Sequence, residues 1–187
     1  ERRRFKSCRG CQFFMRILIT GGSGFLGRAM RGHWTGQEVR TLGRGGRSDY
    51  QWAPADGEMD AMALEGVETV VHLAGESLGP GRWTAGKKAR IRESRIQGTK
   101  LLCQKIAQSD SPPKVLLAAS GIGYYGDCGD TVVDESVPQG AGFLAELCGE
   151  WEAATRPAQE VGVRVVHLRL GIVLGEKGGA LAAMRLP

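Results

Sequence analysis

A short apolar segment that leads into a glycine-rich turn constrains the fold of this chain more than any other feature. Residues 16–20 have the composition of a buried strand, and Gly21, Gly24 and Gly27 follow at three-residue spacing where a helical pattern begins. The first glycine permits a tight turn, the second lets the backbone approach a pyrophosphate, and the third lets the helix pack closely on the strand. The alternative is a glycine-rich turn with a structural role only. The residues expected to hold a dinucleotide here are Gly21, Gly24, Phe25, Leu26 and Gly27.

Apolar runs alternate with helical patterns along the rest of the chain. Strands are expected at about 15–20, 38–42, 68–73, 114–119 and 163–170, and helices at about 24–33, 84–108 and 143–161. Strands that are apolar nearly throughout and separated by helices predict an α/β fold, a Rossmann-type doubly wound parallel sheet with helices on both faces. Such sheets bind ligands at the carboxyl ends of their strands, where the strand order reverses.

The 187 residues fit one domain better than two. Residues 1–14 show neither a helical nor a strand period, so we expect a disordered basic extension, or sequence that precedes a natural start at Met15. The domain then covers residues 15–187. It stops in a helical pattern after only five expected strands, which predicts that the C-terminal part of the domain is missing.

The end of the second expected strand indicates which dinucleotide is bound. An acidic residue there would accept a hydrogen bond from the ribose 2′-hydroxyl of NAD, and residues 38–42 are followed by none. Arg44 and Arg47 follow instead, and a guanidinium can pair with a 2′-phosphate while it stacks on adenine. The alternative is that both arginines are solvated loop charges. NADP(H) is therefore the expected cofactor, with Arg44 as the residue that selects it.

Several motifs resemble a known superfamily. Residues 20–27 (TGGSGFLG), 70–76 (VVHLAGE) and 94–102 (SRIQGTKLL) resemble the extended short-chain dehydrogenase/reductases, the group that contains the nucleotide-sugar epimerases and dehydratases. A second set is similar to one branch of that group, the epimerase family proteins: residues 82–83 (RW), 119–127 (ASGIGYYGD), 150–152 (EWE) and 168–175 (LRLGIVLG). The resemblance extends from Met15 to the last residue.

The resemblance implies roles for residues beyond the glycine turn. Ala74 and Gly75 are expected to line the cofactor, Ser120 to lie beside the nicotinamide, and Arg95 to support the network on the cofactor side. Each role has a simpler alternative, because 74–75 could be an ordinary turn and Ser120 could cap one. His72 is more often a buried strand histidine than a catalyst.

The catalytic pattern of the superfamily is absent. Its ordinary members carry Tyr-x-x-x-Lys on a helix, where the lysine lowers the pKa of the tyrosine that moves a proton. Phe143 and Leu147 stand in those two positions here. Ser120 and Tyr125 are the remaining candidates for catalysis, although a Tyr-Gly pair more often packs near a strand end. The simplest interpretation of three nearby carboxylates is a solvated helical face: Glu146, Glu150 and Glu152.

Two functions remain open after this reading. The first is an NADP(H)-dependent oxidoreductase or epimerase that acts on a carbonyl or sugar-like small molecule through a non-standard proton donor. The second is a protein that binds NADP(H) for sensing or regulation without turnover. Loss of the Tyr and Lys favours the second, whereas the retained cofactor turn favours some redox chemistry.

Charge and cysteine content bear on partners and compartment. Residues 1–14 hold five basic residues and one acidic residue, a balance of +4 out of a net charge of +5, which leaves +1 for residues 15–187. We therefore expect no nucleic-acid partner for the domain. An odd number of cysteines predicts reduced thiols in a cytoplasmic protein. Cys8 and Cys11 have zinc-ligand spacing, but no second pair follows at a useful distance, and no apolar stretch reaches membrane-spanning length.

Overall fold

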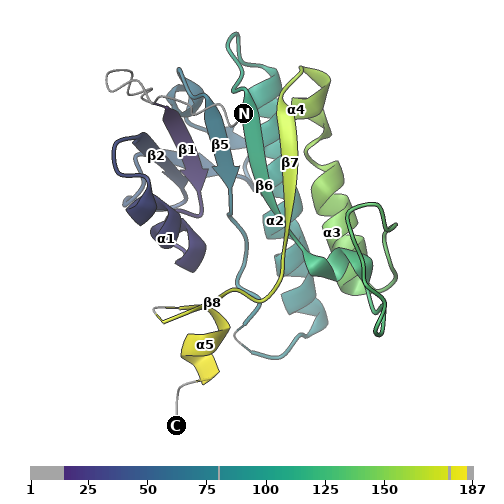
Figure 1. Cartoon of the computed structure of the whole chain (residues 1–187). Helices are drawn as coiled ribbons and strands as arrows, with labels where there is room; N and C mark the ends of the chain where they lie inside the picture. The colour runs from purple at the N-terminus through teal and green to yellow at the C-terminus, as the bar shows by residue number, and fades with distance from the viewer. Residues whose placement is uncertain (1–14, 80, 177, 185–187) are drawn as a thin grey trace, which may run out of the picture.

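A seven-stranded sheet forms the centre of the molecule (Figure 1). The computed structural model describes residues 15–79, 81–176 and 178–184. Along the sheet the strand order is β4-β3-β2-β1-β5-β6-β7, and among these strands only β4 runs antiparallel to its neighbour. The strands are β1 (Arg16–Thr20), β2 (Glu38–Gly43), β3 (Tyr50–Ala53), β4 (Glu58–Met59), β5 (Thr69–His72), β6 (Val115–Gly121) and β7 (Arg164–Leu170).

The strand order reverses beside β1. From β1 the chain builds outward through β2, β3 and β4, and it then returns to the other side of β1 with β5, β6 and β7. The carboxyl ends of β1 and β5 therefore border the position at which doubly wound sheets bind their ligands. The predicted α/β fold is confirmed. Each of the five expected strands matches an observed strand, with both ends within two residues of those observed.

β3 and β4 were not predicted from the sequence, so the described sheet has seven strands rather than the expected five. β4 has only two residues, and β3 (YQWA) lacks a continuous apolar run such as the Val70-Val71 pair of β5, which is equally short. β3 pairs with β2 only through Leu42 and Gly43, at the far end of β2.

Helices cover the two faces of the sheet unequally (Figure 1). The larger core cluster packs β-strand residues such as Leu18 and Leu116 against Leu102 and Ile106 of the central helix. On the opposite face Ile19 belongs to a smaller cluster against the first helix. The helices are α1 (Phe25–His33), α2 (Ala85–Ala107), α3 (Phe143–Ala153) and α4 (Arg156–Glu160), and α2, α3 and α4 share the face opposite to α1.

The single helix expected over 143–161 is wrong, because the chain breaks between α3 and α4. Pro157 has no N–H with which to continue an α-helical ladder, and it lies in the first turn of α4 instead. The Thr155 hydroxyl donates to the carbonyl oxygen of Glu152 at 2.7 Å and occupies one of the last acceptors of α3. Beyond β7 a small hairpin carries β8 (Leu174–Gly175), and α5 (Gly179–Met184) follows it.

Neither a membrane span nor a metal cluster is present in the part of the chain that the structure describes. No helix there is long and apolar enough to cross a bilayer. No group of three or more His, Cys, Asp or Glu side chains there could hold a metal ion. The expectations for residues 1–14, including the spacing of Cys8 and Cys11, lie outside the described residues.

Candidate functional site

The glycine turn between β1 and α1 has the geometry that its spacing predicts. Gly21 has a φ of 69°, in the left-handed region, and a methyl group there would lie 2.8 Å from the carbonyl carbon of Leu73 at the end of β5. A methyl group at Gly27 would lie 2.7 Å from Gly22 Cα and closer still to the Gly21 carbonyl oxygen. Side chains are thus excluded by backbone on both sides. What remains is bare backbone at the N-terminus of α1, whose first N–H groups have no helical acceptor.

Phe25 and Leu26 form the first turn of α1, and both are half-buried. Methyl groups added to Gly175 or Gly178 would lie 2.5 and 2.6 Å from the Phe25 ring, so the hairpin of β8 packs against this side chain. The predicted contribution of Phe25 to cofactor binding therefore rests on its backbone N–H. Its ring instead attaches the hairpin to the start of α1, below the sheet in Figure 1.

A buried chain of hydrogen bonds fixes the ends of β1 and β5 side by side. The Thr20 hydroxyl lies 2.7 Å from His72 Nδ1, and His72 Nε2 lies 2.9 Å from the Thr99 hydroxyl on α2. Trp151 of α3 donates to the same Thr99 hydroxyl at 2.9 Å. Complete burial lowers the pKa of His72 to about 4, so the ring is neutral at physiological pH. The expectation that His72 is a buried strand histidine is confirmed.

Arg95 lies beneath the loop that follows β5. Its guanidinium donates to the carbonyl oxygens of Glu76 and Ile91 at 3.0 and 3.2 Å, and it sits 5.0 Å from the centre of the Trp151 ring. A methyl group on Gly75 would lie 3.1 Å from this guanidinium, so the loop crosses Arg95 at van der Waals distance. Arg95 is 8% exposed and acts from below the backbone at 74–76. The position fits the supporting role that the resemblance implies.

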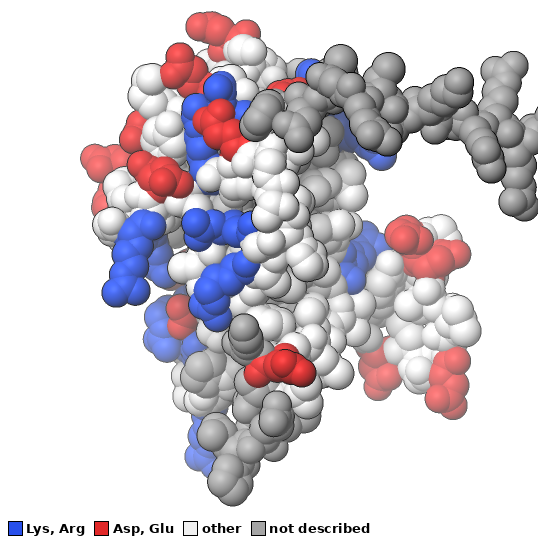
Figure 2. All heavy atoms as spheres, turned by 60° about the vertical axis from the view of Figure 1, so that its left-hand side comes forward, with Lys and Arg blue, Asp and Glu red and all other residues white. Residues whose placement is uncertain are grey.

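Basic side chains gather where the loop after β5 faces the end of β2. Lys87 pairs with Glu76 at 2.8 Å, and Arg90 lies 3.9 Å from the same carboxylate. The hydrogen bond and charge of Lys87, with smaller contributions from Arg90 and Arg44, hold the pKa of Glu76 below its usual range. Arg44 itself is exposed. Figure 2 shows several Lys and Arg side chains together in the middle of the face that is turned forward there.

Asp49 is a carboxylate near β2 that the sequence reading missed. Its Oδ2 accepts hydrogen bonds from the Thr41 backbone N–H at 2.7 Å and from the Thr41 hydroxyl at 2.8 Å. Burial acts to raise the pKa of Asp49, but these bonds outweigh it and leave the pKa below its usual value. Asp49 ties the start of β3 to β2. It could not be recognised because β3 itself was not expected.

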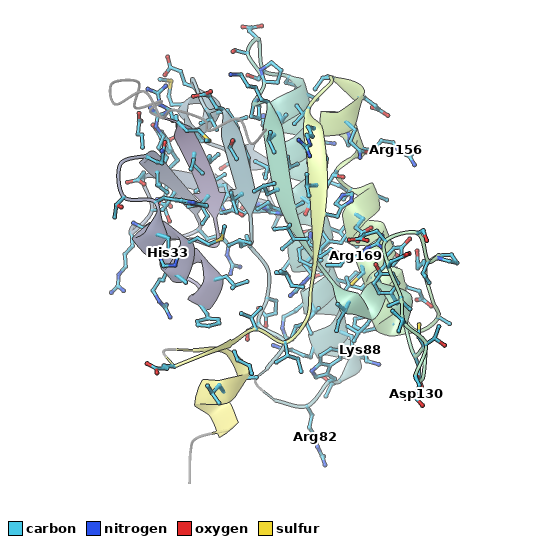
Figure 3. All side chains as sticks on the ribbon, in the orientation of Figure 1. His33, Arg82, Lys88, Asp130, Arg156 and Arg169 are labelled. Atoms are coloured by element: carbon cyan, nitrogen blue, oxygen red, sulfur yellow. The ribbon has the colours of Figure 1, made fainter. Side chains whose placement is uncertain are left out.

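Ser120 and Tyr125 both contact one ion pair between β7 and α3. Arg169 of β7 binds both carboxylate oxygens of Glu152 at 2.9 Å, and it donates to the Tyr125 hydroxyl at 2.9 Å. The Ser120 hydroxyl donates to Glu152 at 2.7 Å. The structure therefore brings the two predicted catalytic residues together, but around a carboxylate on α3. Figure 3 labels Arg169 at this position, between strand and helix.

The expectation that Glu152 belongs to a solvated face is wrong. Its side chain is only 11% exposed, because Arg169 reaches it from the neighbouring strand. Burial acts to raise the pKa of Glu152, but the hydrogen bonds from Arg169 and Ser120 outweigh it and leave the pKa below its usual range. Glu146 and Glu150 are exposed as expected. An arginine inside the apolar strand 164–170 is the signal that could have revealed a buried partner.

Phe143 and Leu147, the substitutes for the catalytic tyrosine and lysine, have different surroundings. Leu147 is 2% exposed and belongs to the core, whereas Phe143 is half-buried and lines a pocket of about 370 Å³. Trp83 packs edge to face on Phe143, with 6.0 Å between ring centres. The Lys88 ammonium lies 5.1 Å from the centre of the Phe143 ring. Lys88 was not among the predicted site residues, because nothing in the sequence places α2 against the start of α3.

Comparisons with known proteins place these features in a family. The model of the NAD dependent epimerase/dehydratase family matches residues 17–186. The chain is 41% identical over 174 residues to the epimerase family protein Mb2239 of Mycobacterium bovis, covering 90% of this chain and 57% of the relative. It is 35% identical over 183 residues to the epimerase family protein YfhF of Bacillus subtilis, covering 92% of this chain and 59% of the relative. The chain thus spans less than two thirds of the length of these relatives.

Two solved structures are similar to this chain in both fold and sequence. The human epimerase family protein SDR39U1 (isoform2) with NADPH superposes with a TM-score of 0.78 at 31% identity, over 91% of this chain and 58% of that one. The nucleoside-diphosphate sugar epimerase of Corynebacterium glutamicum superposes with a TM-score of 0.77 at 34% identity, over 91% of this chain and 36% of that one.

Proposed function

The chain belongs to the NAD dependent epimerase/dehydratase family, and from this premise we propose that it binds NADP(H) and uses it in an oxidoreductase or epimerase reaction. The substrate is a small carbonyl or sugar-like molecule. The observation that carries this proposal is the glycine turn at the start of α1, where Gly21 and Gly27 have no room for a side chain and the first N–H groups of the helix have no helical acceptor. The cofactor, when bound, accepts or donates a hydride. The protein's own residues hold it, exclude water and move the accompanying proton.

The phosphates fit the start of α1. The backbone N–H groups of Phe25, Leu26 and Gly27 lie in the first helical turn, where they lack helical acceptors. No acidic side chain occupies that turn to compete with a bound anion. Ala74 and Gly75 follow β5 on the other side of the turn, so they border the same crevice.

The preference for NADP(H) rests on Arg44. Its side chain is exposed at the end of β2, and its charge acts on Glu76 across the crevice. Asp49, the carboxylate near this strand, already accepts two hydrogen bonds from Thr41. A 2′-phosphate therefore meets a cation here, and a ribose 2′-hydroxyl meets no uncommitted carboxylate that follows β2 directly. The human relative solved with NADPH supports the same choice.

Tyr125 is the better of the two candidate proton donors. Arg169 donates a hydrogen bond to the phenol oxygen and lies 5.0 Å from its ring centre, so the Tyr125 hydroxyl is held in a fixed position. Tyr125 is half-buried, whereas Ser120 is buried. Ser120 is 5% exposed and commits its hydroxyl to Glu152, which makes it a positioning residue for Arg169.

A non-catalytic sensor of NADP(H) is the second candidate function. Phe143 and Leu147 favour it, because a phenyl ring cannot move a proton and Leu147 is buried in the core. The two functions differ in one measurable property. An enzyme oxidises NADPH in the presence of a carbonyl substrate and loses rate when Tyr125 becomes Phe, whereas a sensor binds NADPH with no turnover.

The binding proposal is tested by titrating the chain with NADPH and with NADH while its tryptophan fluorescence is recorded. We expect NADPH to bind more tightly, since a charge-assisted contact contributes on the order of 1.5–3 kcal/mol, roughly ten- to hundredfold in Kd. Arg44→Asp should narrow or reverse the preference. Arg156→Asp is the matched control, because Arg156 is an exposed arginine on α4, outside this loop. Equal affinities for the two cofactors in the unmodified chain would overturn the assignment.

A further inference from the structure

The pocket beside Phe143 combines an apolar lining with one cationic side chain. It lies between the residues that precede α2 and the first turn of α3, close to the turn that follows β6. Trp83, Phe143 and Leu144 supply its apolar surface, and Lys88 supplies its charge. In Figure 3 the labelled Lys88 lies at the lower end of α2, next to the start of α3.

Glycine backbone forms much of the remaining wall. Gly126 has a φ of 70° and Gly142 a φ of 96°, conformations that side chains rarely adopt, and both line the pocket. A methyl group on Gly123 would lie 3.0 Å from Leu144 Cβ, so the turn after β6 packs directly on α3. This wall carries no polar side chain. A ligand with several hydroxyl groups would find few side-chain partners along it.

Lys88 supplies the one side-chain polar group of the pocket that has neither a hydrogen-bond nor a carboxylate partner among the described residues, and its ammonium lies over the Phe143 ring. The Trp83 indole N–H donates to the Leu78 carbonyl oxygen at 3.1 Å and is therefore occupied. No described carboxylate lies within 4 Å of Lys88, whereas its neighbour Lys87 is paired with Glu76. Lysine in the first turn of a helix is unfavourable to the helix dipole, and α2 has no acidic residue there to offset it. Helix stability therefore does not account for Lys88.

We propose that this pocket binds a small, flat, apolar compound that carries one carboxylate, with Lys88 paired to the carboxylate and the apolar body packed against Trp83 and Phe143. As a statement about the substrate, this inference rests on the proposed function. The class is an aromatic or similarly flat carboxylic acid, and it differs from a polyhydroxylated sugar. A carboxylate in the pocket gives Lys88 the anionic partner that none of the described residues supplies. The edge-to-face pair of Trp83 and Phe143 offers a flat body the contact that aromatic rings favour.

The experiment measures binding of 2-naphthoate, 2-naphthamide and glucuronate to the full chain by calorimetry. The naphthoate should bind about tenfold more tightly than the amide, because the two share a ring system and differ in charge. Glucuronate has the charge without the flat body and should bind more weakly than naphthoate. Equal affinities for naphthoate and naphthamide, or tighter binding of glucuronate, would overturn the proposal.

Variants locate the site. Lys88→Met should weaken naphthoate binding by about tenfold while naphthamide binding stays unchanged, and Lys88→Arg should restore most of the loss. Lys100→Met is the matched control, because Lys100 is an exposed lysine of α2 outside the pocket. Unchanged naphthoate affinity in Lys88→Met contradicts the proposal. If Lys88→Met fails to fold, Lys88→Arg and the ligand comparison on the unmodified chain still decide.

Titration of NADPH in the same samples separates this inference from the proposed function. Naphthoate binding that depends on Lys88, without NADPH binding, would refute the cofactor assignment and leave the pocket assignment standing. NADPH binding without any preference for naphthoate over naphthamide would refute the pocket assignment and leave the cofactor assignment standing.

Discussion

The two ends of the sheet's carboxyl edge differ in the groups that form the candidate site: backbone at one end and side chains at the other. At the β1 end the candidate site is backbone: Gly21 and Gly27 let the turn and α1 pack closely, and the first N–H groups of the helix have no helical acceptor. At the β6 end it is side chains, and Tyr125 meets its partner Arg169 from a strand 44 residues further along the chain. A backbone site is encoded by local spacing, whereas a side-chain site depends on long-range packing. Under the proposed function, the cofactor end keeps the family's glycine turn, whereas the other end lacks the Tyr-x-x-x-Lys pair.

The largest expected effect is at the β6 end, where the superfamily's Tyr and Lys are absent. Leu147→Lys should destabilise the fold by several kcal/mol, because Leu147 is 2% exposed and an ammonium at its place would be taken out of water into the core. Ala153→Lys, at an exposed position of the same helix, should leave the melting temperature nearly unchanged. Thermal unfolding measures both variants. A stable Leu147→Lys chain would show that α3 packs differently from this description.

Phe143→Tyr alone is therefore the informative restoration. Its hydroxyl would extend from a half-buried ring that already lies 5.1 Å from the Lys88 ammonium, so a cation is in place without Leu147→Lys. We expect this single variant to fold normally and to raise NADPH-dependent reduction of aldehydes and ketones, since general acid catalysis contributes about 10²–10⁴ in rate. The double variant should be less active because it is less stable. Equal rates for Phe143→Tyr and the unmodified chain would count against a nicotinamide near this helix.

The β1 end should lose stability at mildly acidic pH. The pKa of His72 falls from 6.5 to about 4 on folding, so the unfolded chain takes up a proton that the folded chain refuses. The stabilisation is complete above pH 6.5 and declines as the pH falls towards 4, by on the order of 3 kcal/mol in total. Denaturant unfolding between pH 7 and 4.5 measures it. His72→Gln should flatten the curve, and an unchanged slope would contradict the burial of His72.

At the β6 end, Glu152 should titrate at lower pH than His72, and a different substitution tests its contribution to stability. The folded-state pKa of Glu152 is depressed, so its stabilisation is present above the unfolded value of about 4.3 and is lost as the pH falls through the folded value. At neutral pH, Glu152→Ala should cost on the order of 3 kcal/mol, because it leaves Arg169 without its carboxylate. Glu150 lies on the same helix as Glu152 and forms an exposed pair with Arg92 of α2. Glu150→Ala breaks that pair and should cost less than about 1 kcal/mol. Similar losses in both variants would remove the distinction.

The sequence predicted those parts of the molecule whose causes are local. The turn at Gly21 and the five long strands follow from spacing and apolar runs, and their prediction is confirmed. The partnership of Glu152 with Arg169 could not be predicted, because it depends on how β7 packs beside α3, which no local pattern encodes. The break before Pro157 was readable from proline chemistry but was overridden by the helical pattern on either side. β3 was missed because its four residues, unlike those of the equally short β5, contain no continuous apolar run.

The smallest stability change is expected at the glycine turn, where the effect on binding is the larger one. Gly27→Ala places a methyl group against backbone of residues 21 and 22, which should cost about 1–3 kcal/mol and weaken NADPH binding severely. Gly32→Ala is the matched control in the same helix, because nothing lies within 4 Å of its added methyl group. It should be neutral or stabilising by up to about 1 kcal/mol. Fluorescence titration with NADPH compares the two variants. Equal NADPH affinities would show that the glycine turn is not the phosphate site.

A crystal structure of the chain with NADPH tests the central claim most directly. We expect the pyrophosphate at the backbone of residues 24–27, the 2′-phosphate against the Arg44 guanidinium, and the nicotinamide near the end of β6, facing the pocket at Phe143. Density for a dinucleotide whose 2′-phosphate avoids Arg44, or whose nicotinamide turns away from β6, would contradict it.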